Sequence, residues 1–387
     1  YNRIHVRRIK PRLKGISKIL MNVAVRLNPI LKIKRHIPKV HNLIIDFLGS
    51  LSPYLFKNID YAFKSDWYKE IEKIAKKSDV IHVHDLPLVR TAIAIGRRYK
   101  IPVIFDLHEN WPEAMIAHTK YKGLKKYLLK FVVDVYKRQE CYSLKYADKI
   151  IVVVDESKKR LINKGITKNK IFVIMNSVDI PFFNKNKNHK KVARIVKKIK
   201  GKEGFIVTYT GTFGKHRGLE LAIKAMPNII KKNSNVHLLL VGDGPNKNEL
   251  EKLVKELRIQ KNVHFMGFVP SKYLPTFINY SDVCFVLHAD TLHTRTTIPH
   301  KLFEYMALGK PVIVTNVAPL KRIVNKEKCG FVVNYDKQEI AQAIIDFTDK
   351  KLAIQLGNNG RSSAKKYSWK KISKVLIDIY KNWEKIY

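Results

Sequence analysis

The chain has 387 residues, and 45% of them are hydrophobic, so it is not a disordered chain and is long enough for two domains. Lys and Arg number 75 against 32 Asp and Glu, a formal net charge of +43. This charge suits phosphate esters, anionic lipid surfaces or nucleic acid, or lysines that only solvate the surface. The three cysteines are widely spaced, which argues against disulfides and structural zinc. No apolar run reaches ~18 residues, so no membrane-spanning helix is expected.

Short runs rich in β-branched and aromatic residues alternate with amphipathic stretches of helical period. This order is typical of an α/β protein with parallel sheets. The ten predicted strands are 80–85, 103–108, 149–154, 172–177, 205–211, 237–244, 263–268, 283–288, 311–316 and 330–334. Helical patterns lie between them, for example at 218–232 and 246–258.

The strands fall into two groups, separated by residues 184–204, which are rich in Lys and Asn. We interpret this segment as a linker with a short helix. Each group of strands predicts a Rossmann-like domain, and the cleft between two such domains is the expected ligand site. Residues 1–75 contain basic amphipathic stretches, such as 16–36, whose fold the pattern does not indicate.

Two histidines, His82 and His84, alternate in the first predicted strand and therefore share a face. With Asp85 they offer side chains that bind transition metals. No other ligand cluster accompanies them, and Asp85-Leu86-Pro87 is typical of a strand end followed by a turn. The sequence favours the turn, and no metal site is predicted.

The strand at 205–211 runs through a glycine-rich loop into a helix, in the stretch YTGTFGKHRGLELAIKAM. Gly211 and Gly218 let the backbone approach a ligand closely, and Lys215 and Arg217 add positive charge. The loop is therefore a candidate phosphate site. By itself it is weak evidence, because any sharp strand-to-helix turn uses glycine.

A second candidate phosphate site is the stretch IPHKLFEYMALGKP at 298–311. Pro299 is predicted at the first helical position, and Gly309 after the last turn. His300 and Lys301 then lie in the first turn, where the helix dipole disfavours cations. A bound phosphate would reverse this effect, because it accepts the free N–H groups and attracts both side chains.

A helical wheel divides this helix into two faces. The face predicted to pack on the sheet holds Leu302, Phe303, Met306 and Ala307, and the other holds Lys301, Glu304, Tyr305 and Leu308. Glu304 could accept hydrogen bonds from two neighbouring hydroxyls, such as those of a ribose. A surface ion pair between Lys301 and Glu304 is the alternative.

Five motifs in this order and spacing resemble the donor half of glycosyltransferase family 4: YTGTFGKHRGLE, LLLVGDGP, VHFMGFVP, PHKLFEYMALGKPVIVT and CGFVV. The stretches DVIHVHD, IPVIFDLHENWPEAM, ADKIIVVV and NSVD resemble its acceptor half. The resemblance covers roughly residues 78–370. It implies a GT-B fold and a retaining enzyme that uses a nucleotide-activated sugar.

The resemblance also implies roles for single residues. Glu304 matches the second acid of the family's E-x7-E motif, which binds the nucleotide ribose. The first acid, which contacts the transferred sugar, would fall at Thr296, so the chain departs from the family there. Arg217 takes the place of the basic residue that neutralises the diphosphate. The family often has an arginine where this chain has Thr212, and Lys215 or Lys301 could compensate.

Further donor contacts are implied at the loops beside these residues. The backbone from Thr297 through Pro299 to His300 would face the sugar and the diphosphate. The backbone around Phe268 would meet the base, and Asp243 would border the nucleotide pocket. These positions, with Gly211, complete the predicted donor site.

The reaction implied is a retaining transfer with no cofactor and no obligatory metal, since the nucleotide-sugar is a substrate. Arg, Lys and helix N–H groups would stabilise the leaving diphosphate. His108, at the end of strand 103–108, corresponds to a family histidine that points toward the donor sugar. Glu109 is a candidate for orienting the acceptor. The alternative for His108 is a strand-end histidine in an ordinary loop.

The acceptor is predicted to be a glycan or a polyprenyl-diphosphate-linked sugar, in surface polysaccharide or glycolipid synthesis. Residues 16–36 and 123–138 are the expected contacts with an anionic membrane surface. The alternative is that these helices pack on the sheet with their lysines outward. The expected location is the cytoplasm, with peripheral attachment to the inner face of the plasma membrane.

Three parts are predicted: an acceptor domain at 1–184, a donor domain at 185–368, and a helix at 369–387 that packs back on the first domain. The first strand and glycine-rich loop usual in the family are not evident in the first part, which leaves open a truncated start.

Three other functions stay open. One is a sugar-nucleotide epimerase of the same fold, and another is an inactive, binding-only relative. The third is a nucleic-acid-binding protein, which only the charge suggests. The chain has no recognisable nucleic-acid module, so no nucleic-acid partner is predicted.

Overall fold

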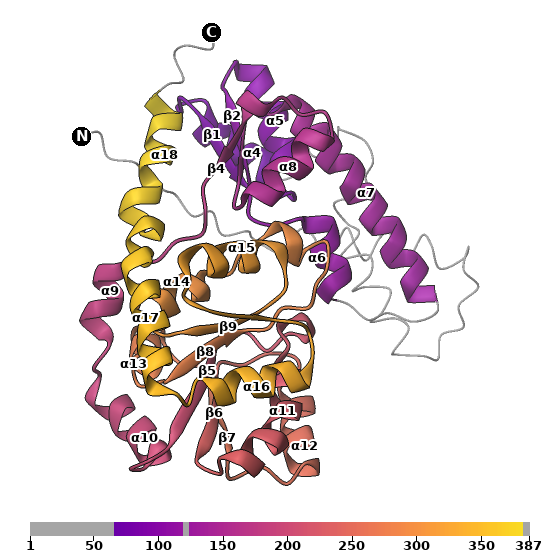
Figure 1. Cartoon of the computed structure of the whole chain (residues 1–387). Helices are drawn as coiled ribbons and strands as arrows, with labels where there is room; N and C mark the ends of the chain where they lie inside the picture. Colours follow the sequence, from indigo (N-terminus) through magenta and orange to yellow (C-terminus); the bar gives the residue numbers. More distant parts are fainter. Residues whose placement is uncertain (1–65, 119–123, 382–387) are drawn as a thin grey trace. The chain divides into compact units, whose positions relative to one another are not determined.

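The computed structural model describes residues 66–118 and 124–381 (Figure 1). The described chain divides into two compact units. The first unit holds residues 66–107 and 124–150, and the second unit holds 108–118 and 151–381. The basic segment 16–36 lies outside the described residues. The domain boundaries expected at residues 184 and 368 stay a prediction, as does the packing of the last helix on the first domain.

The first unit contains two parallel strands and three helices, followed by the start of a third strand. Its elements are α4 (Asp66–Ala75), β1 (Ile81–His84), α5 (Val89–Tyr99), β2 (Val103–Leu107), α7 (Leu124–Tyr146) and the beginning of β3 (Lys149–Val152). Tyr68, Ala75 and Ile95 form a small core between the first two helices. Asp148 fixes the start of β2, because its Oδ2 accepts a hydrogen bond of 2.7 Å from the Val103 N–H.

The second unit contains the remaining elements in chain order. They are α6 (Trp111–His118), α8 (Asp155–Asn163), η1 (Lys168–Lys170), β4 (Ile171–Val173), α9 (Ile180–Asn186), α10 (Lys190–Lys200), β5 (Phe205–Thr210), η2 (Lys215–Arg217), α11 (Leu219–Lys232), β6 (Val236–Val241), α12 (Lys247–Glu256), β7 (Val263–Gly267), η3 (Ser271–Tyr273), α13 (Leu274–Asn279), β8 (Val283–Val286), η4 (Thr294–Thr296), α14 (His300–Ala307), β9 (Val312–Thr315), α15 (Ala318–Glu327), β10 (Gly330–Val333), α16 (Lys337–Asp346), α17 (Lys350–Ala364), η5 (Lys365–Tyr367) and α18 (Trp369–Lys381).

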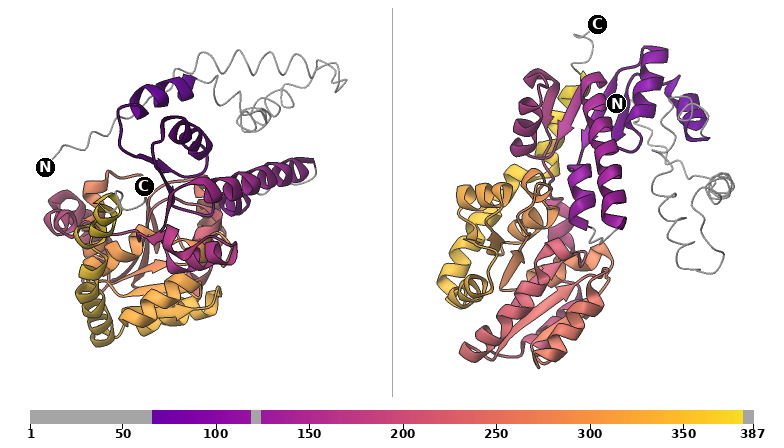
Figure 2. Two further views of the ribbon diagram at one scale, coloured as in Figure 1. Left: turned by 90° about the horizontal axis from the view of Figure 1, so that it is seen from above. Right: turned by 90° about the vertical axis from the view of Figure 1, so that its right-hand side faces the viewer.

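All ten predicted strands are present, and they form two sheets. The strand order is β1-β2-β3-β4 in one and β10-β9-β8-β5-β6-β7 in the other. Every strand pair of the six-stranded sheet is parallel, as the alternation of strands and helices predicts. In Figure 2 the strands of this sheet run between helices.

Side chains of the six-stranded sheet alternate between two hydrophobic clusters. On β6, Leu238 and Leu240 pack in the cluster with α11, α12 and α16, whereas Leu239 and Val241 pack in the cluster with α10 and α13. Successive strand residues point to opposite faces, so strands buried on both faces must be apolar throughout. This explains why the predicted strands are continuous apolar runs.

The short helix expected within residues 184–204 is present. Most of the segment is α10, whose Val192 and Val196 are buried against the sheet. Its lysines lie on the opposite face of a strongly amphipathic helix, which lowers the average apolar content of the segment without preventing packing.

Within residues 66–118 and 124–381, no helix is both long and apolar enough to cross a membrane.

Candidate functional site

The glycine-rich loop after β5 is held tightly against its neighbours. Gly211 has a φ of +126°, and its N–H donates a 2.8 Å hydrogen bond to the Val241 carbonyl at the end of β6. Gly218 has a φ of +71°, and a Cβ there would lie 2.7 Å from the Leu287 Cβ. Backbone conformation therefore favours glycine at both positions.

The helix α14 begins one residue later than predicted. Pro299 is its N-cap in extended conformation, and His300 is the first helical residue. The prediction for the far end is confirmed, because Gly309 follows the helix with a φ of +69°. His300 and Lys301 thus lie in the first turn, at the positive end of the helix dipole. The His300 ring is exposed, and its Nδ1 lies 3.1 Å from the Ser177 carbonyl oxygen.

The helical wheel is wrong for Tyr305 and Leu308, which are buried together with the predicted sheet face. Tyr305 reaches β5, where its hydroxyl accepts a 2.9 Å hydrogen bond from the Thr210 N–H. This bond and a 3.1 Å contact between the two hydroxyl oxygens satisfy the buried phenol. The polar face of α14 is therefore narrow. The Tyr305 hydroxyl ties the helix to the end of β5, where the glycine-rich loop begins.

Lys301 and Glu304 remain on that polar face, and both are half-buried. The Lys301 ammonium lies 3.7 Å from the centre of the Tyr209 ring. It also borders Gly211, since a Cβ at Gly211 would be 2.6 Å from Lys301 Nζ. The two stretches that the sequence singled out as phosphate sites therefore meet at this ammonium.

Burial disfavours the charged forms of Lys301 and Glu304. Burial, and then repulsion from Arg217, holds the pKa of Lys301 well below its ordinary value. Burial raises the pKa of Glu304 to about 7, against the opposing effect of Lys301. An anion bound beside Lys301 and Arg217 would relieve their mutual repulsion, so the site is electrostatically suited to a phosphate group.

Arg217 is fixed by His288, a residue outside the predicted donor site. Its Nη1 donates a 2.8 Å hydrogen bond to Nε2 of His288, which is buried. Burial, and then the charges of Arg217 and Lys301, hold the pKa of His288 well below its ordinary value. Because arginine cannot accept a hydrogen bond, the neutral imidazole must carry its proton on Nδ1.

His288 belongs to a group of three buried histidines. The rings of His288 and His293 each lie 5.9 Å from the ring of His216. His288 ends the predicted strand 283–288 at the edge where loops bind ligands, and His216 lies in the glycine-rich loop. The sequence positions of His288 and His216 could have indicated that both lie near the site. That His293 lies beside His216 follows only from the fold.

His108 and Glu109 lie beside the segment that precedes α14. Thr297 Oγ1 donates a 3.3 Å hydrogen bond to the His108 carbonyl oxygen. Glu109 Oε2 lies 3.7 Å from Nε2 of His293. The structure thus places both residues in the second unit with the donor-side loops. Their catalytic roles stay predictions.

Thr296, at the position where the family has its first acid, is turned inward. Its hydroxyl donates to the carbonyl oxygens of Leu292 at 2.9 Å and His293 at 3.1 Å. The side chain is buried in this small helical turn.

The other predicted donor residues lie on loops around this centre. Lys215 Nζ is 3.6 Å from Glu249 Oε1, an exposed pair that contributes little to stability. The Asp243 carbonyl accepts a 2.9 Å hydrogen bond from the Phe213 N–H, which ties the loop after β6 to the glycine-rich loop. Phe268, directly after β7, is 82% exposed. An exposed aromatic ring at the carboxyl end of a strand is available for stacking.

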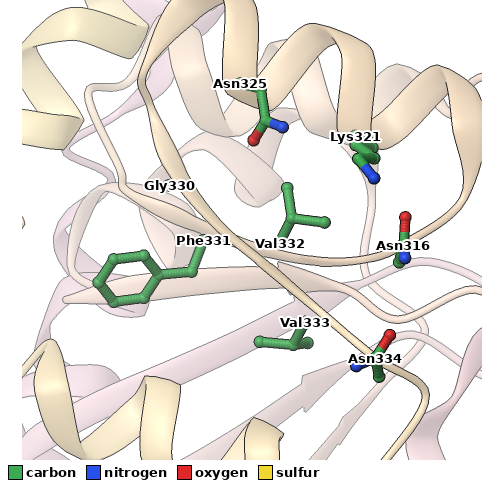
Figure 3. A pocket seen from close by; sticks show the side chains of 8 residues that line it. All are labelled: Asn316, Lys321, Asn325, Gly330, Phe331, Val332, Val333 and Asn334. Carbon is green, nitrogen blue, oxygen red and sulfur yellow. The ribbon is translucent and has the colours of Figure 1, made fainter.

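A cavity of about 400 Å³ lies elsewhere in the second unit, between α15 and the edge strand β10 (Figure 3). Polar side chains of Asn316, Lys321, Asn325 and Asn334 line it. None of the predicted site residues does so, and we do not assign the donor site to it.

Two family models match the chain. One, described as glycosyl transferases group 1, matches residues 183–363, and the other, described as Glycosyltransferase Family 4, matches residues 31–181. The chain belongs to glycosyltransferase family 4, and its two parallel-sheet α/β parts have the GT-B fold. The resemblance inferred from the sequence motifs is confirmed.

Individual relatives are distant. The α-monoglucosyldiacylglycerol synthase of Acholeplasma laidlawii is 21% identical over 335 residues, which cover 82% of this chain and 78% of that protein. The phosphatidylinositol N-acetylglucosaminyltransferase GPI3 subunit of Saccharomyces cerevisiae is 21% identical over 62% of this chain and 52% of its own length. The crystal structure of Anabaena HepE in complex with UDP and glucose superposes with a TM-score of 0.64 at 18% identity, covering 82% of this chain and 80% of that one.

Proposed function

We propose that this glycosyltransferase moves a sugar, with retention of anomeric configuration, from a nucleoside diphosphate sugar to a hydroxyl group of a lipid-linked or glycan acceptor. The observation that carries the proposal is the meeting of Arg217, Lys301 and the first turn of α14 beside the Gly211 loop. The UDP and glucose bound to the related HepE support a uridine nucleotide as the first donor to test.

The diphosphate is the group that this arrangement fits. Arg217 offers a planar fork of N–H donors, held in place by His288. Lys301 has a lowered pKa in the empty site, and a bound anion would favour its protonated, positively charged form. The free N–H groups of α14 lie at its N-terminus, which is also the positive end of the helix dipole, and both stabilise a bound anion. Glu304, one turn further, would accept hydrogen bonds from the ribose hydroxyls.

In the proposed reaction the bond between the sugar C1 and the diphosphate oxygen breaks, and its electron pair leaves on the diphosphate. The acceptor oxygen forms a new bond to C1 from the same face. The acceptor proton passes to an oxygen of the departing phosphate, so no protein base is required. His108 is proposed to contact the sugar, and Glu109, near His293, to orient the acceptor.

The stabilisation of the leaving group would come from Arg217, Lys301 and the N–H groups of α14. We therefore propose that the reaction has no obligatory metal. The names of the two relatives support a glycolipid acceptor, since one is an α-monoglucosyldiacylglycerol synthase and the other is a subunit of a phosphatidylinositol N-acetylglucosaminyltransferase. Contact with an anionic membrane surface stays a prediction.

Calorimetric titration tests the donor site. UDP, GDP, ADP and CMP are titrated into the wild type, Glu304→Ala and Arg217→Ala. Arg194→Ala is the matched control, because it removes an exposed arginine from α10 in the same unit. We expect one nucleotide to bind, with at least tenfold loss in both site variants and no loss in the control. Binding that is equal in all four proteins, or no binding to the folded wild type, would refute the donor site.

The transfer step needs a separate measurement. The binding nucleotide is supplied as its sugar conjugate with glycolipid acceptors, and the product anomer is read by NMR. Retention with product formed in the presence of a chelator supports the proposal. Inversion, or interconversion of the donor without an acceptor, would replace it with another GT-B reaction.

A further inference from the structure

The first unit brings together two histidines and an aspartate from neighbouring strands. β1 and β2 run parallel in a register that places His84 opposite Asp106 and His82 opposite Ile104. Residues two apart on a strand share a face, and so do directly opposite residues of paired strands. His82, His84 and Asp106 therefore project from one face at the carboxyl ends of the two strands.

Both ring nitrogens approach the same oxygen of Asp106. Nε2 of His82 lies 3.2 Å from Oδ2 of Asp106, and Nδ1 of His84 lies 3.3 Å from the same oxygen. The two imidazole rings stack with centroids 4.7 Å apart and planes tilted by 17°. One atom from each of the three side chains falls within 4.8 Å of the others.

The two nitrogen-to-oxygen separations are close to those of a tetrahedral metal site. Zinc binds imidazole nitrogen and carboxylate oxygen at about 2.0–2.2 Å, so two ligand atoms of a regular tetrahedron lie about 3.3–3.5 Å apart. The nitrogen-to-oxygen distances of 3.2 and 3.3 Å lie at or just below the short end of this range. The three atoms all lie within 4.8 Å of one another, so an adjustment of the side chains would place them around one ion.

The surroundings suit an ion that enters from solvent. The Asp106 and His82 side chains are 12% and 15% exposed, which holds them in place, whereas His84 is 60% exposed. Asp85, the acid that adjoins the two histidines in the sequence, has a φ of +57° where the chain turns away from the strand. The acid that joins the two histidines comes instead from β2, some twenty residues along the chain.

We propose that His82, His84 and Asp106 bind one divalent cation of the zinc class. Two imidazoles and a carboxylate are the ligands that such ions prefer, and three protein ligands leave a coordination position for water or an anionic group. The residues are distinct from the donor-side set, and the proposal does not depend on the proposed function. Among the described residues this is the one group of three such ligands.

The test is metal binding by the intact chain. Chelator-treated protein is titrated with Zn²⁺ by calorimetry, and with Co²⁺ by visible absorption, which reports tetrahedral coordination. The wild type is expected to bind one equivalent at this site. His82→Gln and His84→Gln should each weaken that equivalent at least tenfold and remove the tetrahedral cobalt bands. His189→Gln is the matched control, because His189 is exposed and lies in the second unit.

Three results would overturn the proposal. They are no binding by the folded wild type, an equivalent that survives unchanged in both variants, and equal loss in the control. His84→Gln is the decisive variant, because an exposed side chain can be replaced without disturbing the sheet. Asp106→Asn is a supporting variant only where circular dichroism shows that it folds.

Discussion

Replacing Glu304 by glutamine should stabilise the unliganded protein at alkaline pH while weakening donor binding. The pKa of this carboxyl is about 7 in the folded chain, against an ordinary value of 4.5. A raised folded pKa contributes stability below pH 4.5 that is lost as the pH rises through 7, because the unfolded chain ionises first. Glutamine keeps the shape and stays neutral, so it avoids this loss.

The magnitude follows from the pKa difference. A shift of about 2.5 units corresponds to about 3 kcal/mol when the pH exceeds both values. At pH 5 the same linkage gives only about 1 kcal/mol. The gain in unfolding free energy of Glu304→Gln over the wild type should therefore grow by about 2 kcal/mol between pH 5 and pH 8.

Hydrogen exchange read by mass spectrometry localises the effect. Peptides that cover residues 298–311 report the opening free energy of α14 and its neighbours, which a whole-chain transition would average. The control is Glu256→Gln on α12, where the carboxyl is exposed and a change within about 0.5 kcal/mol is expected.

Two outcomes would refute the reasoning. One is a stability difference that is the same at pH 5 and pH 8, which would mean that the carboxyl is not the titrating group. The other is a variant that is less stable than the wild type at pH 8, which would mean that ionised Glu304 stabilises the empty site. A stabilised variant that also binds the nucleotide at least tenfold more weakly would show that the half-buried acid serves binding and not stability.

Three further predictions follow from the same region. Because the pKa of Lys301 is lowered in the empty site, nucleotide binding at pH 8 should be accompanied by uptake of a proton, and Lys301→Met should abolish this uptake. Calorimetry in buffers of different ionisation enthalpy measures the uptake, and equal uptake in both proteins would contradict the lowered pKa. Tyr305→Phe should lower the urea unfolding free energy by about 1–3 kcal/mol, because the Thr210 N–H loses its acceptor; an unchanged midpoint would show that the bond contributes nothing. Gly218→Ala should cost more than about 1 kcal/mol by thermal unfolding, because its φ is positive and Leu287 blocks a Cβ; a variant as stable as the wild type would disprove this constraint.

Local patterns in the sequence were enough to predict the strands and to select the two candidate phosphate-binding stretches. Strands buried on both faces are continuous apolar runs, and glycine and proline mark where α14 and the loop after β5 end. The motifs added the family and the GT-B fold. These patterns involve only residues close together in the sequence, so they can be recognised without knowledge of tertiary contacts.

The tertiary structure decided which distant residues share an environment. Tyr305 is buried because β5 passes beside α14. A helical wheel considers only the residues of the helix, so it could not predict this. Arg217 is held by His288 from another strand, and His82 and His84 meet Asp106 only through the register of β1 with β2. Charge and pKa depend on such neighbours, since burial and nearby charges set them, so the sequence named the groups while the fold set their chemistry.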